Sequence, residues 1–136
     1  MNKLRGKIKT IETDNELSMV KIEVENTLFS SIIIGTPETL SYLSIDFPVF
    51  IAFNETEMSI GKGLTGKISL KNEFDSIITG IAVGKLLSEI ELDFRGHKLK
   101  SIITSSSTMN LNLAIGDMVT GYVKSTDLSI IEIESI

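Results

Sequence analysis

The chain has 136 residues, of which 42% are hydrophobic and 23% charged, a balance that is typical of a globular protein of one domain or two small ones. The formal net charge of −5 is spread over both halves without a cluster of Lys and Arg, which disfavours a nucleic-acid partner. The absence of cysteine excludes disulfides, zinc-thiolate sites and cysteine nucleophiles. No stretch has the length and hydrophobicity of a signal peptide or a membrane span, so we expect a cytoplasmic protein with no membrane partner.

The first elements along the chain are strands with period-two alternation. Leu4 and Ile8 alternate with basic residues, and Val20, Ile22 and Val24 alternate with Lys and Glu. These patterns predict antiparallel strands with one buried and one solvated face. The sequence Thr36-Pro37-Glu38 then predicts a short helix, because it places a cap, a first-turn proline and a first-turn acid in succession.

The second half repeats the first, and the offset between matching residues indicates an insertion. Residues 4–8 match residues 64–68 at an offset of 60, whereas three later segments match at an offset of 70. We therefore expect about ten additional residues in the second copy. Most of them would lie in 72–84, between its first two strands, and two would lengthen the hairpin tip around Arg95-Gly96-His97.

The remaining elements of the second copy complete the predicted fold. Ile90, Leu92 and Phe94 alternate with acidic residues and predict another half-buried strand, and a second short helix is expected from about Ser106 to Leu113. About five short strands and one helix per copy is the pattern of a small OB-like barrel. We expect an all-β fold of two tandem OB-like barrels, with modules at 1–62 and 63–136.

A run of hydroxyl residues in the second copy is the candidate functional site. Five consecutive residues, from Thr104 to Thr108, carry hydroxyl groups at the expected helix start, and Lys124 and Ser125 lie near the chain's end. Hydroxyl and N–H donors with one ammonium group suit an oxyanion. A fully ionised dianion such as molybdate, tungstate or sulfate only accepts hydrogen bonds, so a site without a carboxylate suits it. The alternative is structural, because runs of Ser and Thr are usually loops and helix caps.

These residues and their order resemble the molbindin family, also called Mop or TOBE. The family pattern has an opening Asn-x-Leu-x-Gly, a central Ile-Thr-x-x-Ser and a terminal Ile-Lys-Ala/Ser-Ser/Thr. The chain shows the first as residues 2–6, the second as 103–107, and the third, with valine first, as 123–126. The resemblance extends over both copies and implies OB-like barrels that associate into symmetric oligomers and bind molybdate or tungstate between subunits.

The resemblance also implies a ligand set. Thr104, Ser107 and Lys124 match the family's threonine, serine and lysine ligands, and Ser59 matches a serine that precedes the opening motif. The family's arginine position falls on Gly61, with Lys62 adjacent. The residues that we expect to contact the oxyanion are Thr104, Ser105, Ser107, Lys124, Ser125, Ser59 and Lys62. The first copy has Ile34, Pro37 and Asn54 at the three ligand positions, which predicts a structural role for it.

These features predict a protein that is not an enzyme and that has no cofactor or metal-cation ligands. Its function would be to bind molybdate or tungstate for storage, homeostasis or delivery, as a homotrimer. The sole histidine, His97, is expected in a solvated hairpin, and the candidate site lacks a catalytic base. The alternative is a tandem TOBE-type interaction or regulatory module that has lost anion binding. An OB-type RNA binder is disfavoured because the chain is acidic and has few aromatic residues.

Overall fold

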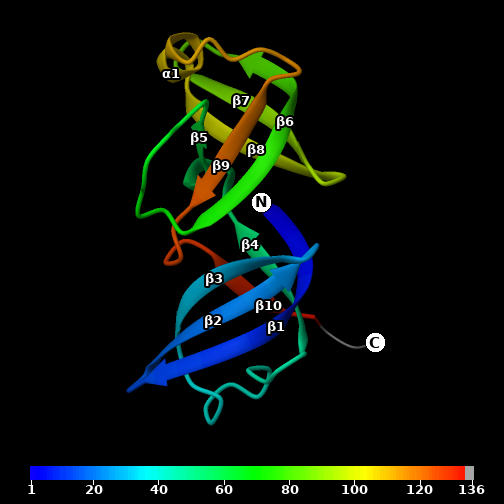
Figure 1. Cartoon of the computed structure of the whole chain (residues 1–136), viewed down its shortest axis with the longest axis vertical. Coiled ribbons are helices and arrows are strands. Elements are labelled where there is room, and N and C mark those ends of the chain that lie inside the picture. Colours follow the sequence, from blue (N-terminus) through cyan, green and yellow to red (C-terminus); the bar gives the residue numbers. More distant parts are fainter. Residues whose placement is uncertain (134–136) are drawn as a thin grey trace. The chain divides into compact units, whose positions relative to one another are not determined.

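Two five-stranded antiparallel sheets form the fold of this computed structural model, which describes residues 1–133 (Figure 1). The strand orders are β10-β4-β1-β2-β3 and β5-β9-β6-β7-β8. One α-helix and one short 3-10 helix, η1, accompany the strands in the described residues, which confirms the all-β prediction. The elements are β1 (Asn2–Asp14), β2 (Leu17–Val24), β3 (Thr27–Ile34), β4 (Pro48–Phe53), η1 (Glu55–Glu57), β5 (Ser59–Gly61), β6 (Asn72–Val83), β7 (Leu87–Phe94), β8 (His97–Thr104), α1 (Ser105–Asn110), β9 (Met118–Val123) and β10 (Ser129–Glu132).

Each sheet takes its outermost strand from the other sequence copy. Strand β5 ends the first copy but pairs with β9, and β10 ends the second copy but pairs with β4. Unit 1 therefore consists of Met1–Asn2 and Asn54–Val123, and unit 2 of Lys3–Phe53 and the described chain from Lys124 onward. The modules 1–62 and 63–136 stay a prediction from the sequence repeat, and the compact units follow the strand exchange instead.

The buried positions follow the predicted alternation. In unit 2, Ile8, Val20 and Ile22 are fully buried, and in unit 1 Ile90 and Leu92 are as well. The strands β2 and β3 form a hairpin with a two-residue turn, and β7 and β8 form another of the same length. Both central residues of each turn have positive φ, which is the backbone of a type I′ turn. The hairpin tip around Arg95-Gly96-His97 is therefore not lengthened, contrary to the prediction.

The predicted position of the insertion is wrong. Residues 64–68 form no strand, and the counterpart of β1 is β6, which begins at Asn72, so the offset between the copies is 70 throughout. Asn2 and Asn72 begin these strands and are both buried, with 5% and 1% of their surface exposed. The match of residues 64–68 was misleading because two apolar residues around a glycine and a lysine are common in many local structures. The ten additional residues are 62–71, between the copies.

Strand geometry explains why the chain needs these residues. Strands β5 and β6 are both antiparallel to β9 and lie on its two sides, so they run parallel to each other. A parallel pair cannot be joined by a tight hairpin turn, so the chain must cross over to return to the start of the next strand. Residues 62–71 make this crossover, within which Gly63 and Gly66 have positive φ.

The helix predicted at Thr36 in the first copy is also wrong. The amide of Leu40 donates to the carbonyl of Thr36 at 2.9 Å, but the segment forms only a turn. In the second copy, Thr104 caps α1 by accepting a hydrogen bond from the amide of Ser107. At the corresponding positions Ile34 has no hydroxyl group and Pro37 has no N–H, so the first copy lacks both partners of this cap.

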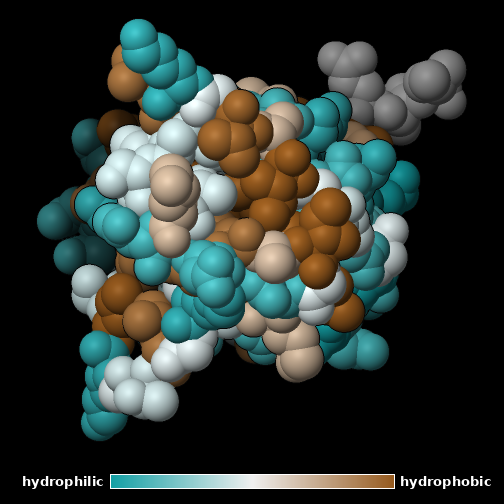
Figure 2. All heavy atoms as spheres, turned by 90° about the horizontal axis from the view of Figure 1, so that it is seen from above, coloured by the Kyte–Doolittle hydropathy of each residue, from teal (hydrophilic) through white to brown (hydrophobic). Residues whose placement is uncertain are grey.

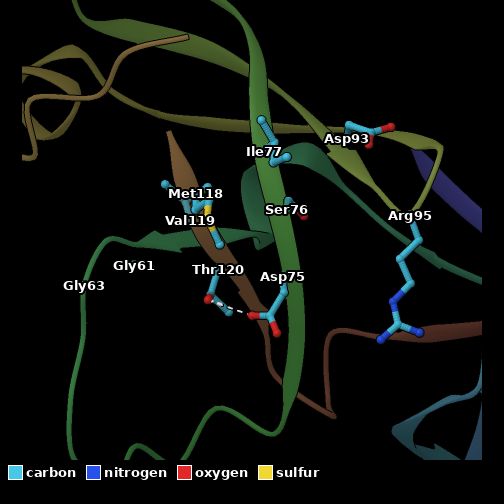
Figure 3. Close-up of a pocket in the computed structure, with 10 residues that line it drawn as sticks. All are labelled: Gly61, Gly63, Asp75, Ser76, Ile77, Asp93, Arg95, Met118, Val119 and Thr120. Atoms are coloured by element: carbon cyan, nitrogen blue, oxygen red, sulfur yellow. Dashed lines mark hydrogen bonds between the residues drawn. The ribbon is translucent and has the colours of Figure 1, made fainter. Parts of the chain in front are cut away.

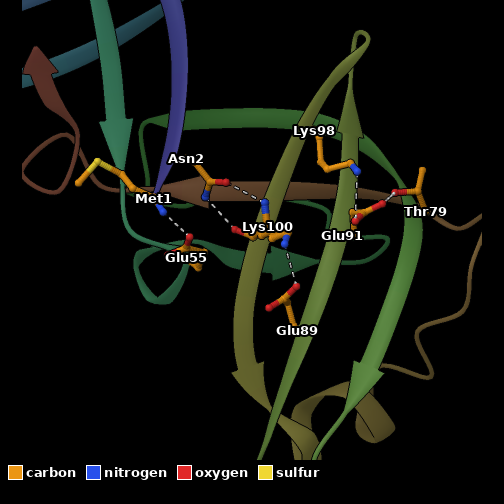
Figure 4. A network of polar contacts seen from close by, with 8 residues as sticks. All are labelled: Met1, Asn2, Glu55, Thr79, Glu89, Glu91, Lys98 and Lys100. Carbon is orange, nitrogen blue, oxygen red and sulfur yellow. Dashed lines mark hydrogen bonds and ion pairs between the residues drawn. The ribbon is translucent and has the colours of Figure 1, made fainter.

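Buried side chains form hydrogen bonds with the segments that lead to the exchanged strands β10 and β5. In unit 2 the Ser31 hydroxyl donates to the carbonyl of Leu128, and in unit 1 the Ser101 hydroxyl donates to that of Met58. The side-chain amide of Asn2 makes two 2.8 Å hydrogen bonds with the backbone of Lys100 (Figure 4). It donates to the Lys100 carbonyl and accepts from the Lys100 N–H, as the backbone of a paired strand would. Among residues 1–133 no helix has the length and hydrophobicity needed to cross a membrane.

Candidate functional site

The hydroxyl groups of Thr104 and Ser107 form an ordered, accessible pair at the start of α1. Thr104 Oγ1 donates to Ser107 Oγ at 2.8 Å and accepts from the Ser107 amide at 3.1 Å. Thr104 is exposed and Ser107 is half-buried. Within residues 1–133 the Ser107 hydroxyl donates no hydrogen bond, so its proton is available to an acceptor from outside the chain.

Ser105 differs from this pair because it is part of the interior. It is 6% exposed, and its hydroxyl donates to the carbonyl of Gly84 at 2.7 Å. Ser88 lies 2.9 Å from the same hydroxyl. A serine has one hydroxyl proton, and this one is used inside the protein. The contacts support a structural role for Ser105, and its predicted role as an anion ligand has no support in the geometry.

A cation lies at the same end of unit 1. Lys62 Nζ donates to the carbonyl of Asn112, just after α1, at 2.8 Å and is 3.0 Å from Asp117 Oδ2. The hydrogen bond from Lys62, followed by that from the Ala114 amide, lowers the pKa of Asp117. Lys62 is therefore already paired. Ser59 is exposed and lies opposite Tyr122 in the pairing of β5 with β9.

Lys124 and Ser125 belong to unit 2, whereas Thr104, Ser105 and Ser107 belong to unit 1. Lys124 is exposed and forms no ion pair with residues 1–133. The Ser125 hydroxyl donates to Ser30 Oγ at 3.4 Å, and the Ser125 carbonyl accepts from the amide of Ile32 at 3.1 Å. The strand exchange has thus divided the predicted ligand set.

The strand register shows how completely the set is divided. Thr104 pairs with Leu87, beside the end of β6 at Val83, whereas Val123 pairs with Asn72 at the start of β6. A straight strand of this length would span about 35 Å. A lysine side chain reaches only about 6 Å beyond its backbone. Val123, the residue before Lys124, therefore lies at the opposite end of β6 from Thr104.

The first copy has no comparable donors in these positions. Ile34, at the position of Thr104, is 82% exposed, and Pro37 takes the position of Ser107. Asn54, at the position of Lys124, forms the cap of η1. Its backbone N–H donates a hydrogen bond to Glu57 Oε1 at 2.8 Å. Among the described residues, no group of three or more His, Cys, Asp or Glu side chains is arranged to hold a metal ion.

Comparisons with known proteins agree with this fold. The TOBE domain model matches residues 68–130, which begin just before β6 and include Lys124. The molybdenum import ATP-binding protein ModC of Brucella abortus is 33% identical over 73 residues, which are 53% of this chain and 20% of that protein. The molybdenum transport protein ModE of Azotobacter vinelandii is 36% identical over 63 residues, or 46% of this chain and 23% of that protein. The chain thus spans about a fifth of the length of these relatives.

The chain belongs to the Mop/TOBE family. The solved structure of the cytoplasmic molybdate-binding protein ModG, with molybdate bound, has the same fold with a TM-score of 0.86. The alignment covers 96% of this chain and 95% of that one, at 14% sequence identity.

The corrected register moves two positions of the Mop/TOBE pattern. With Asn72 as the opening asparagine, the preceding serine and arginine positions fall on Ser69 and Lys71 instead of Ser59 and Gly61. Neither residue was predicted, because the residue match at 64–68 placed the start of the second copy at an offset of 60. The three later segments, which all match at 70, were the signal that could have identified them.

One cavity in unit 1 has the wrong charge for a dianion. It measures about 580 Å³ and is bordered by β5, β6 and β9 (Figure 3). Asp75 and Asp93 line it together with Arg95, and Asp75 accepts a hydrogen bond from Thr120 at 3.0 Å. Carboxylates repel an anion and cannot donate a hydrogen bond to it. The Thr104–Ser107 pair is therefore the better candidate.

An apolar surface borders this pair. The view from above shows hydrophobic residues gathered on one face, with hydrophilic residues around them (Figure 2). Large apolar side chains next to α1 and at the turn between β6 and β7 are more than half exposed. They are Val83, Leu86, Leu87, Met109 and Ile115. A large exposed apolar group of this kind usually marks a contact with another molecule.

Proposed function

We propose that this Mop/TOBE chain binds molybdate or tungstate reversibly, without catalysis, for storage, homeostasis or delivery in the cytoplasm. The observation that supports this proposal most directly is the accessible Thr104–Ser107 pair. A hydrogen bond between the two hydroxyls orders them, and the Ser107 hydroxyl retains a proton to donate. No carboxylate hydrogen-bonds to either hydroxyl among the described residues. A dianion that only accepts hydrogen bonds suits such donors.

We further propose that a neighbouring chain supplies the positive charge. Lys124 follows Val123, at the end of β6 opposite to Thr104, and Lys62 is paired with Asp117. Lys124 with Ser125, or Lys71 with Ser69, would approach the hydroxyl pair from another subunit. The apolar surface beside α1 supports such an association. In a homotrimer with cyclic symmetry, each subunit would make this same contact with the next one, so that no contact surface is left unpaired.

Three relatives support the choice of anion. ModG is described as a cytoplasmic molybdate-binding protein, and ModC and ModE as proteins of molybdenum import and transport. The TOBE domain model matches residues 68–130, the part of the chain that contains Thr104 and Ser107. Molybdate and tungstate have nearly the same size and charge, so both are proposed ligands.

Calorimetric titration with molybdate tests the proposal. Ser107→Ala removes the available donor but leaves the Thr104 cap, which needs only the amide of residue 107. Loss of one hydrogen bond to a charged ligand should weaken binding by about tenfold to a hundredfold. Ser106→Ala, at the exposed neighbour, is the matched control and should bind as the wild type does. Saturable binding of phosphate but not of molybdate, or no binding of either, would refute the proposal.

The second candidate function is an interaction or regulatory module without anion binding. The apolar surface beside α1 favours it, because that surface suits a protein partner whether or not an anion is present. The two functions differ in the response to molybdate. An interaction module would show neither heat on titration nor any sensitivity to Ser107→Ala.

A further inference from the structure

The outer faces of the two sheets carry opposite charge at equivalent positions. In unit 2, β1 and β2 direct basic side chains away from the core, whereas in unit 1 the equivalent strands β6 and β7 direct acidic ones away from it. The offset of 70 sets a cation against a carboxylate at three positions, namely Lys3 and Glu73, Arg5 and Asp75, and Lys21 and Glu91. Two copies of the chain therefore offer each other surfaces of complementary charge.

The basic face of unit 2 has cations that are free to meet a partner. It consists of Lys3, Arg5 and Lys7 on β1 and Lys21 on β2, all of them exposed. Lys3 Nζ lies 4.5 Å from the centre of the Phe50 ring. Arg5, Lys7 and Lys21 form no ion pair with residues 1–133, although Glu23 lies opposite Lys7 in the register of β1 with β2.

The acidic face of unit 1 has carboxylates that are equally free. It consists of Glu73 and Asp75 on β6 and Glu89, Glu91 and Asp93 on β7. Glu89 and Glu91 are paired with lysines of β8 at 3.2 Å and 3.7 Å (Figure 4). The other three form no ion pair within the part of the chain that the structure describes. Three carboxylates therefore remain for a partner.

Two of these carboxylates border a hollow. Asp75 and Asp93 line the cavity of about 580 Å³, together with Ile77 and Met118, which are 46% and 80% exposed (Figure 3). Arg95 also lines it and leaves the two carboxylates in excess. A long basic side chain suits this hollow, because its alkyl stem covers apolar surface while its charged end meets a carboxylate.

We propose that the basic face of one chain binds the acidic face of a second copy, with Arg5 and Lys7 directed toward Asp75 and Asp93. The contact shares no residue with the Thr104–Ser107 pair or with the apolar surface beside α1, so it does not depend on anion binding. It joins two different surfaces, so each chain can hold one neighbour at each face. A nucleic acid or another acidic protein would use the basic face alone.

Salt dependence gives this contact a distinctive sign. With a net charge of −5, chains that meet at random repel each other, so removal of salt should weaken non-specific association. Attraction between complementary faces instead becomes stronger at low salt. Sedimentation equilibrium without molybdate should therefore give a higher weight-average mass in about 20 mM than in about 300 mM sodium chloride.

Charge reversal of each face identifies the partner. Arg5→Glu with Lys7→Glu reverses the basic face, and Asp75→Lys with Asp93→Lys reverses the acidic one. Each double variant should weaken the low-salt association about tenfold. The second variant brings the net charge closer to zero, so an effect of net charge would strengthen association instead. All four substitutions together keep the wild-type net charge and exchange the signs of the faces, so association should return.

The control for charge reversal in general is Lys85→Glu, at an exposed lysine outside both faces. It should change the low-salt association by less than about twofold. A mass that does not rise at low salt, stronger association after reversal of the acidic face, or no recovery with all four substitutions would each overturn the proposal. Failure of the proposed oxyanion function would leave these results unchanged, because the solutions contain no molybdate.

Discussion

At the scale of single residues, the hydroxyl run from Thr104 to Thr108 combines two roles. The sequence could identify the run, but it could not say which hydroxyls face outward. The structure divides them, because Ser105 and Thr108 are buried whereas Thr104 and Ser106 are exposed. The half-buried Ser107 is ordered by Thr104 and retains its proton. Only the three-dimensional packing of α1 against β7 and the Gly84 turn decides this.

Ser105→Ala should destabilise the fold and leave any anion contact intact. The substitution leaves the carbonyl of Gly84 and the hydroxyl of Ser88 each without a partner. We expect a loss of about 1 to 3 kcal/mol in the free energy of unfolding, measured by urea denaturation. Ser106→Ala, at an exposed position, should change this free energy by less than about 0.5 kcal/mol. Equal effects of the two substitutions would contradict the assignment of Ser105 to the interior.

The Lys62–Asp117 pair should make stability depend on pH in the acidic range. Lys62 and the Ala114 amide lower the pKa of Asp117 below its ordinary value of 3.8. A lowered folded pKa contributes stability that is present above the unfolded value and is lost as the pH falls through the folded one. Asp117→Asn should therefore be less stable than wild type at pH 7, and the difference should vanish near pH 2. Urea unfolding at both pH values measures it, and a difference that grows in acid would contradict the pairing.

At the scale of elements, local pattern predicted the strands well and their register less well. The alternation of Val20, Ile22 and Val24 depends only on neighbouring residues, and the structure buries all three. The start of the second copy depends on which strands pair, which no local pattern encodes, and it was placed at residue 64 instead of Asn72. The exchange of β5 and β10 was likewise not predicted. The last strand of each copy has the same residue pattern whether it pairs within its own copy or with the other copy, so the sequence does not distinguish the two arrangements.

The assignment of β10 to unit 2 can be tested through Leu128. This side chain is 2% exposed and lies in the segment that leads to β10. Leu128→Ala should cost about 2 to 4 kcal/mol by leaving a cavity. Hydrogen exchange followed by mass spectrometry should show faster exchange in β3 and β4 and little change in β6 to β8. Equal acceleration in β6 to β8 would contradict the strand exchange.

At the scale of the whole molecule, the divided ligand set connects anion binding with association. A ligand that binds only the assembled form shifts the equilibrium toward assembly. Molybdate should therefore raise the sedimentation coefficient of dilute protein, and Ser107→Ala should abolish this response. Ile115→Lys, at the apolar surface beside α1, should lower the sedimentation coefficient with or without molybdate. Sedimentation that is indifferent to molybdate would contradict the coupling.

The central claim is that one site takes its hydroxyls from one chain and its lysine from another, and mixing two defective variants tests it most directly. Ser107→Ala and Lys124→Ala should each bind molybdate poorly by calorimetry. When the two are unfolded together and refolded as a mixture, about a quarter of the sites in a randomly assembled homotrimer should combine an intact Ser107 with an intact Lys124. Recovery of tight binding at about that fraction is the predicted result. If the mixture binds no better than the separate variants, the claim that neighbouring chains share the site is wrong.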